Sequence, residues 1–223
     1  MADDEDDQSL GNVVERGVVR FLYRPKVGEE HADTVKDENL DDVQRFYMVL
    51  APRDRSLCRL LVIGRKRLPD VDDHERNWGF VEAISDSESG LEQGLQEKTY
   101  ETKTRGERVV PAARSVGDGR YVIAELEGSL RFVYKLLEPR KTNAVQRAFN
   151  IAPEAAFVIS IKNPEKSSPP GAGLPEHEEA DYPKSLQKSF RGRRFADEVK
   201  LLDYEGAEFV LVGTSENPMP STK

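Results

Sequence analysis

Hydrophobic and polar residues alternate along much of this chain with the period of two that is typical of β-strands. In the segment VVRFLYR this alternation places Val19, Phe21 and Tyr23 on one face of the predicted strand. Arg20 and Arg24 fall on the opposite face. Similar runs, rich in valine, isoleucine and aromatic residues, are separated by glycine, proline and aspartate, which indicates a mainly β protein. The other strands expected from these runs cover residues 45–52, 58–69, 77–85 and 155–164.

Turn signals predict that several of these strands are antiparallel neighbours. Residues 114–139 contain the sequences GDG and EG between apolar runs, and compact turns of this kind join adjacent antiparallel strands. Residues 200–213 show the same pattern, with Glu205 and Gly206 at the expected turn. We therefore expect a meander in the middle of the chain and a hairpin near its end.

Helical signals are fewer and shorter. Leu91 and Leu95 have helical spacing, but two glycines lie close to them. Residues 181–192 favour a helix more strongly, since Pro183 suits the first turn. Residues 163–183 are rich in proline, glycine and acidic residues, which predicts a long surface loop.

We expect a single folded unit. Residues 1–12 are expected to be a disordered acidic tail, and residues 13–223 a single mainly β domain. Residues 184–213 would supply a helix and the last hairpin, because a segment this short has no independent core. The predicted fold class is α+β, mainly β: an antiparallel barrel or sandwich with one or two short peripheral helices.

Two parts of the chain resemble each other in the same order. We interpret this as an internal duplication, in which residues 18–69 and 129–164 form facing halves of the barrel or sandwich. Two alternatives stay open: β-rich sequences resemble one another by chance, and TNAVQRAF also has the pattern of a short helix capped by Thr142 or Asn143. The matching pieces are VRFLYR at 19–24 with LRFVYK at 130–135, VQR at 43–45 and 145–147, and AP at 51–52 and 152–153.

Composition points to a reducing compartment. The 223 residues include one cysteine, Cys58, which excludes an intrachain disulfide and a multi-cysteine metal site. The start of the chain is acidic, and no apolar run reaches the roughly 20 residues that span a bilayer. We therefore expect a cytoplasmic protein without membrane association. The formal net charge is −8, but acidic residues concentrate at 1–7 and 29–42, two segments that we expect to be flexible, and the remainder is slightly basic.

The cationic side chains are the main candidates for binding chemistry. Arginine presents a fork of donors that matches phosphate oxygens, so a convergence of these residues would form an anion-binding face. The alternative is an ordinary solvated face, on which arginines pair with glutamates. The candidate ligand-binding residues are Arg20, Arg24, Arg65, Lys66, Arg67, Lys103, Arg105, Arg131 and Lys135.

Motifs for catalysis or cofactor binding are missing in recognisable form. His31, His74 and His177 lie in acidic, polar segments away from any candidate nucleophile, and neither glycine-rich phosphate motif occurs. Cys58 lies in an apolar strand and is expected to be a buried, inert thiol. We assign no catalytic residue, no cofactor and no metal site.

Three functions fit these observations. The first is a non-enzymatic binding or adaptor module whose cationic face takes a phosphate-bearing ligand, nucleic acid or an acidic protein. The second is an enzyme acting on a phosphorylated or carboxylated small molecule, with Arg and Lys clamps and with Glu107 or Tyr100 handling protons. The third is a structural subunit whose strands complete an oligomer. The identity of the ligand and the oligomeric state stay open.

Overall fold

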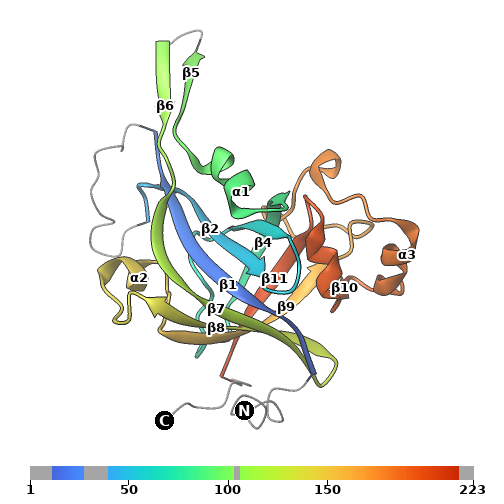
Figure 1. Cartoon of the computed structure of the whole chain (residues 1–223). Coiled ribbons are helices and arrows are strands. Elements are labelled where there is room, and N and C mark those ends of the chain that lie inside the picture. The colour runs from blue at the N-terminus through green and yellow to red at the C-terminus, as the bar shows by residue number, and fades with distance from the viewer. Residues whose placement is uncertain (1–11, 28–39, 103–105, 216–223) are drawn as a thin grey trace.

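Eight antiparallel strands form a closed barrel in the computed structural model, which describes residues 12–27, 40–102 and 106–215 (Figure 1). The strands follow the ring order β1–β2–β3–β4–β11–β9–β8–β7, and β7 pairs with β1 to close it. The predicted mainly β, antiparallel fold is confirmed, and the barrel is the form that it takes. The ring strands are β1 (Asn12–Pro25), β2 (Val43–Pro52), β3 (Cys58–Ile63), β4 (Arg76–Ser85), β7 (Arg114–Leu126), β8 (Ser129–Glu138), β9 (Glu154–Lys162) and β11 (Glu208–Thr214).

Aromatic side chains fill the interior of the barrel. The predicted alternation in β1 is confirmed, because Val19, Phe21 and Tyr23 point inward and are buried. An eight-stranded barrel is just wide enough for its side chains to fill, so inward residues of facing strands touch each other. The ring of Phe21 lies 5.0 Å from that of Tyr134 on β8, two strands away, and 6.1 Å from that of Phe46 on β2.

A short helix closes one end of the barrel. This helix, α2 (Ala144–Ala148), begins at Asn143, whose side chain and that of Gln146 form a reciprocal capping box. Asn143 was one of the two predicted caps. Just after the helix, the ring of Phe149 stacks on Phe46 at 4.8 Å and packs against Tyr23 at 5.3 Å. The helix therefore places an aromatic lid on the apolar interior.

The other end is closed by an ionic cluster of Glu15, Arg55, Arg59, Asp203 and Tyr121. Arg59 points inward from β3 and is fully buried. Its guanidinium donates to both carboxylate oxygens of Glu15, at 2.6 and 2.8 Å, and to Oδ1 of Asp203, at 2.5 and 2.8 Å. Arg55 also donates to both acids, and the Tyr121 hydroxyl donates to Glu15 at 2.8 Å. Two cations thus neutralise two carboxylates inside the barrel mouth.

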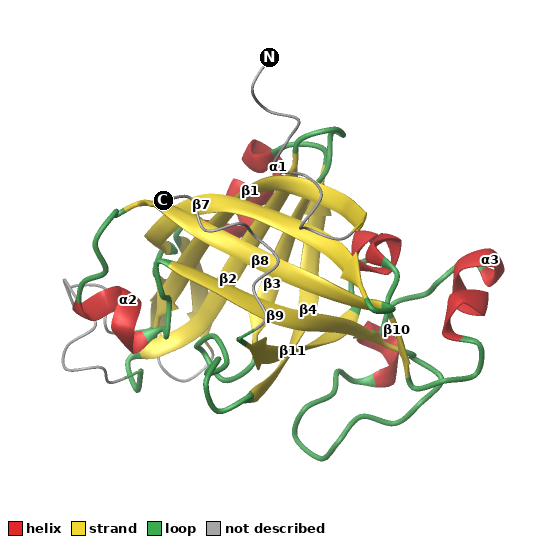
Figure 2. Cartoon of the chain, turned by 90° about the horizontal axis from the view of Figure 1, so that it is seen from below, coloured by secondary structure: helices red, strands yellow, loops and turns green. Residues whose placement is uncertain are grey.

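Helices and loops cover parts of the outer surface. Leu91 of α1 (Glu88–Leu95) is buried against the outward side chains of β2 and β3. The hairpin of β5 (Lys98–Thr102) and β6 (Gly106–Val110) projects away from the barrel beyond α1 (Figure 1). α2 and α3 (Lys184–Gln187) lie on opposite sides of the barrel (Figure 2). The remaining elements are η2 (Glu176–Glu178), η3 (Lys188–Phe190), η4 (Val199–Asp203) and β10 (Phe195–Ala196), which extends the edge of β9.

The predicted hairpin at 200–213 is wrong in its first arm. Residues Val199–Asp203 form the 3₁₀ helix η4, and β11 is the only strand of this segment. Leu201 and Leu202 are adjacent and both fully buried, which a one-sided strand does not allow but a helical turn does. The same turn carries Asp203 to the ionic cluster.

The glycines at 117–119 do not form the predicted turn, since they lie within the continuous strand β7. The register shifts in this stretch in the pairing of β7 with β1 and in its pairing with β8. A Cβ on Gly119 would lie 2.4 Å from the Lys135 carbonyl oxygen. Glycine here therefore permits close strand approach rather than a reversal.

The internal duplication is not confirmed. The VQR triplet at 43–45 lies in strand β2, whereas the triplet at 145–147 lies in helix α2. The first repeat would contain three strands, but the second contains only β8 and β9 around that helix. The predicted acidic tail at 1–12 falls, except for Asn12, outside the described residues, as does most of the acidic segment 29–42. Within the described residues, no helix is long and apolar enough to cross a membrane.

Candidate binding site

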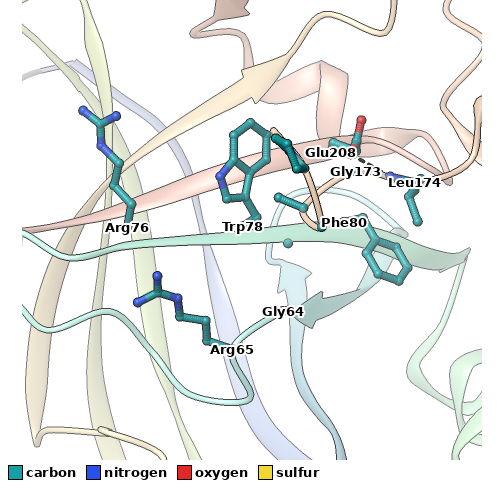
Figure 3. A pocket seen from close by; sticks show the side chains of 12 residues that line it. Gly64, Arg65, Arg76, Trp78, Phe80, Gly173, Leu174 and Glu208 are labelled. Carbon is teal, nitrogen blue, oxygen red and sulfur yellow. Dashed lines mark hydrogen bonds between the residues drawn. The ribbon is translucent and has the colours of Figure 1, made fainter. Parts of the chain in front are cut away.

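A pocket of about 520 Å³ lies on the outer face of β4, beneath a proline- and glycine-rich part of the long loop. Figure 3 shows its side chains from close by. We call it the Trp78 pocket, because Trp78 and Phe80 point outward from β4 into it while Asn77, Gly79 and Val81 alternate inward. It is lined by Gly64, Arg65, Arg76, Trp78, Gly79, Phe80, residues 170–174 and Glu208.

Aromatic rings form the floor of the Trp78 pocket. Trp78 is only partly buried, so one part of the indole stays available for contact. The Trp78 ring also packs against Phe195 of β10, whose ring centre lies 6.0 Å away. Trp78 and Phe80, which both line the pocket, give an apolar surface that can pack against a flat ligand.

A buried ion pair holds the loop wall of the pocket in place. Lys162, which is fully buried, donates to Glu208 at 2.6 Å and to Glu179 of the long loop at 2.8 Å. The same Glu208 carboxylate accepts the main-chain N–H of Leu174 at 3.0 Å (Figure 3). It also accepts the hydroxyl of Ser168 at 3.2 Å. The predicted loop is therefore anchored at both ends of its glycine-rich stretch, and the wall is preorganised.

Two guanidinium groups lie on one side of the Trp78 ring, with Glu208 and the loop wall on the other (Figure 3). Arg65 is exposed and donates to Glu75 at 2.6 Å, and Arg67 donates to the same oxygen at 2.8 Å. Arg76 is exposed and has no hydrogen-bond or ion-pair partner among the described residues. Arg65 and Arg76 are the cationic residues of the lining and Glu208 is its carboxylate, so cations outnumber anions around the pocket.

The acid beside these arginines stays ionised. Burial alone would raise the pKa of Glu75, but its hydrogen bonds from the Asp70 main chain and Arg65, with the charge of Arg67, lower the pKa overall. Glu75 therefore remains a carboxylate at neutral pH and leaves Arg76 as the cation that a ligand can engage without displacing a partner.

The predicted ligand-binding residues are spread over several parts of the barrel. Arg65, Lys66 and Arg67 lie together in the turn after β3, where Lys66 donates to the Val43 carbonyl at 2.7 Å. Arg20 is half exposed on β1 and pairs with Glu88 at 2.8 Å. Lys103 and Arg105 fall outside the described residues.

Three other predicted residues lie on the outer face of the barrel, but only one of them is exposed to solvent. Arg24 points outward but is buried, because its guanidinium donates to the carbonyls of Pro111, at 2.9 Å, and Gly94, at 2.6 Å. Arg131 on β8 is also buried, whereas Lys135 on the same strand is exposed. Arg65 and Lys135 line different pockets, so the candidates do not form one shared face.

Sequence reasoning missed Trp78, Arg76 and Glu208. The alternation in NWGFVE was visible, but Trp78 and Phe80 are its most apolar residues and would have been assigned to the core face. The inward face instead carries Asn77 and Gly79. A Cβ on Gly79 would lie 2.5 Å from the Phe209 ring and 2.6 Å from the Val62 carbonyl oxygen, which explains the glycine at this inward position.

The residues named as possible proton donors and acceptors lie elsewhere. Tyr100 and Glu107 belong to the β5–β6 ladder, which pairs Tyr100 with Arg108 and projects from the barrel. Burial raises the pKa of the Cys58 thiol, which favours the neutral form. No group of three or more His, Cys, Asp or Glu residues that could hold a metal ion occurs in the described part of the chain.

Comparisons with protein-family models, with curated proteins and with solved structures found no match to this chain.

Proposed function

We propose that the protein is a non-enzymatic binding module that holds a planar, phosphate-bearing small molecule, such as a nucleoside phosphate, in the Trp78 pocket. One observation carries the proposal: a partly exposed indole and the guanidinium of Arg76, which has no partner in the described part of the chain, line the same preorganised pocket. Aromatic faces stack on planar rings, and arginine matches phosphate oxygens, so the two groups together select such a ligand.

The size and lining of the pocket support binding of a small molecule. A volume of about 520 Å³ lies within the usual range for small-molecule sites, roughly 300–1,000 Å³. The local positive charge is modest, which suits one or two phosphate groups better than a long polyanion.

The lining favours binding over turnover. Among the described residues that line the pocket there is no serine, cysteine, histidine or lysine, and the one carboxylate, Glu208, already accepts hydrogen bonds from Lys162, Ser168 and Leu174. General acid–base or nucleophilic catalysis requires such a group within reach of the ligand. The enzyme alternative therefore has weaker support at this site.

Trp78 makes the proposal directly testable, because it is the sole tryptophan of the chain. We expect AMP and ATP to quench its fluorescence in a saturable manner at low salt, and adenosine or inorganic phosphate alone to bind at least about tenfold more weakly, since each lacks one of the two contacts. Binding should also raise the melting temperature, by an amount that grows with the logarithm of the ligand concentration once that concentration exceeds Kd.

Paired variants separate the pocket from general charge effects. Arg76→Ala should weaken nucleotide binding by about tenfold, which corresponds to roughly 1.4 kcal/mol. Arg140→Ala, at an exposed arginine between β8 and α2, should leave it unchanged. Equal loss in both variants, or no saturable quenching by any nucleotide, would refute the proposed site.

A further inference from the structure

A second surface lies away from the Trp78 pocket, across the outer faces of β2, β1, β7 and β8. It is a groove of about 670 Å³, and we call it the outer groove. It is lined by Arg16, Gly17, Val18, Ala51, Pro52, Arg53, Arg120, Tyr121, Val122, Lys135 and Leu137. The lining therefore combines four cationic side chains with an aliphatic floor.

The floor of the outer groove exposes apolar side chains that elsewhere are covered. Of the described residues, only four large hydrophobic side chains are exposed: Val14, Val18, Leu137 and Tyr100. Val18 and Leu137 line the groove, whereas Val14 lies at a register shift of β1 and lines a neighbouring pocket. Clustered exposure of aliphatic groups in a concave surface marks an interaction site more than scattered exposure does.

Cationic groups surround this floor. The β7–β8 register places Arg120 directly opposite Lys135, and the β1–β7 register places it beside Val18. Like charges directly opposite each other destabilise a strand pair. Glu154 of β9 lies opposite Lys135 on its other side and offsets part of this repulsion. Arg53 and Arg120 have no side-chain hydrogen bond or ion pair among the described residues. An incoming carboxylate could therefore pair with Arg53 or Arg120 without displacing a partner among the described residues, whereas Arg16 and Lys135 already have interactions.

We propose that the outer groove docks a short, extended protein segment in which acidic residues are interspersed with aliphatic ones. The cations fit carboxylates, and Val18, Val122 and Leu137 fit aliphatic side chains, so the charge pattern and the apolar floor are satisfied together. Nucleic acid fits less well, because its backbone would leave the aliphatic floor uncovered and the floor offers no exposed aromatic ring for stacking.

The dimensions of the outer groove limit the length of the motif. The four strands are separated by about 4.8 Å each, so the groove spans roughly 14 Å, which four or five extended residues cover. Such a small contact gives weak, reversible binding rather than a permanent complex. This surface is independent of the Trp78 pocket, and either proposal can fail without the other.

Fluorescence anisotropy with labelled peptides tests the proposal. We expect the peptide (Asp-Glu-Leu)₄ to bind the full-length protein, and (Asp-Glu-Ser)₄ and (Lys-Arg-Leu)₄ to bind at least about tenfold more weakly. Arg120→Glu, Arg53→Glu and Leu137→Gln should each weaken binding of the first peptide by about fivefold to tenfold, since all three residues are exposed and line the groove. The matched control Lys184→Glu, on α3, should have no effect.

The outcomes discriminate between occupants. Loss in the three groove variants, with unchanged melting temperatures and no loss in the control, supports the proposal. The proposal is overturned if the acidic peptide with leucine does not bind at millimolar concentration, or if it binds all variants equally. The proposal is also overturned if a single-stranded oligonucleotide binds more tightly than the peptide and its binding depends on Arg120, because the occupant of the groove would then be nucleic acid.

Discussion

Arg59→Met tests how the ionic cluster holds the barrel end together. The substitution replaces the guanidinium by an apolar side chain of similar reach, so it removes charge and hydrogen bonds with little loss of volume. Glu15 and Asp203 would lose the donor groups of a residue that is fully buried. Arg55 and Tyr121 would remain as their partners.

The expected loss of stability in Arg59→Met depends on how well the two carboxylates remain neutralised without Arg59. Arg59 makes four hydrogen bonds to the two carboxylates. Breaking one side of a buried ion pair costs about 3–5 kcal/mol, because the remaining charge stays in a poorly solvated site. Arg55 contacts the same two acids, but its side chain is 37% exposed, so Arg55→Met should cost only about 1 kcal/mol.

Urea unfolding followed by Trp78 fluorescence and by circular dichroism measures both free energies of unfolding. The two variants remove partners from the same carboxylates, and the difference between them isolates the effect of burial. We expect Arg59→Met to lower the stability by at least about 2 kcal/mol more than Arg55→Met. Equal costs would show that the mouth of the barrel is solvated and that the reasoning from burial is wrong.

Two further predictions concern the same end of the barrel. Burial alone would raise the pKa of Glu15, but hydrogen bonds and charge from Arg59, with hydrogen bonds from Tyr121 and Arg55, lower it below the ordinary value of 4.5. The ionised Glu15 therefore contributes its full stabilisation above pH 4.5, and this contribution is lost as the pH falls through the lower pKa of the folded state. The urea midpoint should consequently decrease in acid. In Glu15→Gln, which has no carboxyl group to titrate at this position, the midpoint should decrease less over the same pH range. Gly17→Ala should destabilise the protein by about 1–3 kcal/mol in the same assay. The added Cβ would lie 2.1 Å from the Ala51 carbonyl oxygen and 2.8 Å from the Tyr121 ring, and an unchanged midpoint would contradict this geometry.

The strand pattern was readable because alternation reports burial on one side of a sheet. The inward positions of Phe21 on β1, Phe132 on β8 and Phe157 on β9 all follow from it. The pattern failed at Leu201 and Leu202, which are adjacent in the 3₁₀ helix η4 and both belong to the main core cluster. A period of two does not reveal such a helical turn packed on the core.

The candidate site was less predictable than the fold. Arg65 was identified because it belongs to a dense basic cluster, but Arg76 is an isolated arginine at a strand start. Arg59 was not assigned any role, since its place inside the barrel depends on Glu15 and Asp203, which are 44 and 144 residues away. Which cations face ligand, protein or solvent is decided by these long-range contacts.

Closure of the barrel determines where recognition can occur. Aromatic side chains fill the interior, Phe149 covers one end, and Arg59 with its acidic partners closes the other. The interior formed by the described strands therefore has no room for a ligand, and binding must occur on the outer faces. Outward positions of a closed barrel are free to vary without disturbing the core, except where another segment covers them. The Trp78 pocket arises where the long loop is anchored by Lys162, and the outer groove arises where the cover is missing. The two surfaces therefore suit different ligands. The preorganised pocket suits a small molecule, and the open cationic groove suits a peptide segment whose apolar side chains cover the aliphatic floor.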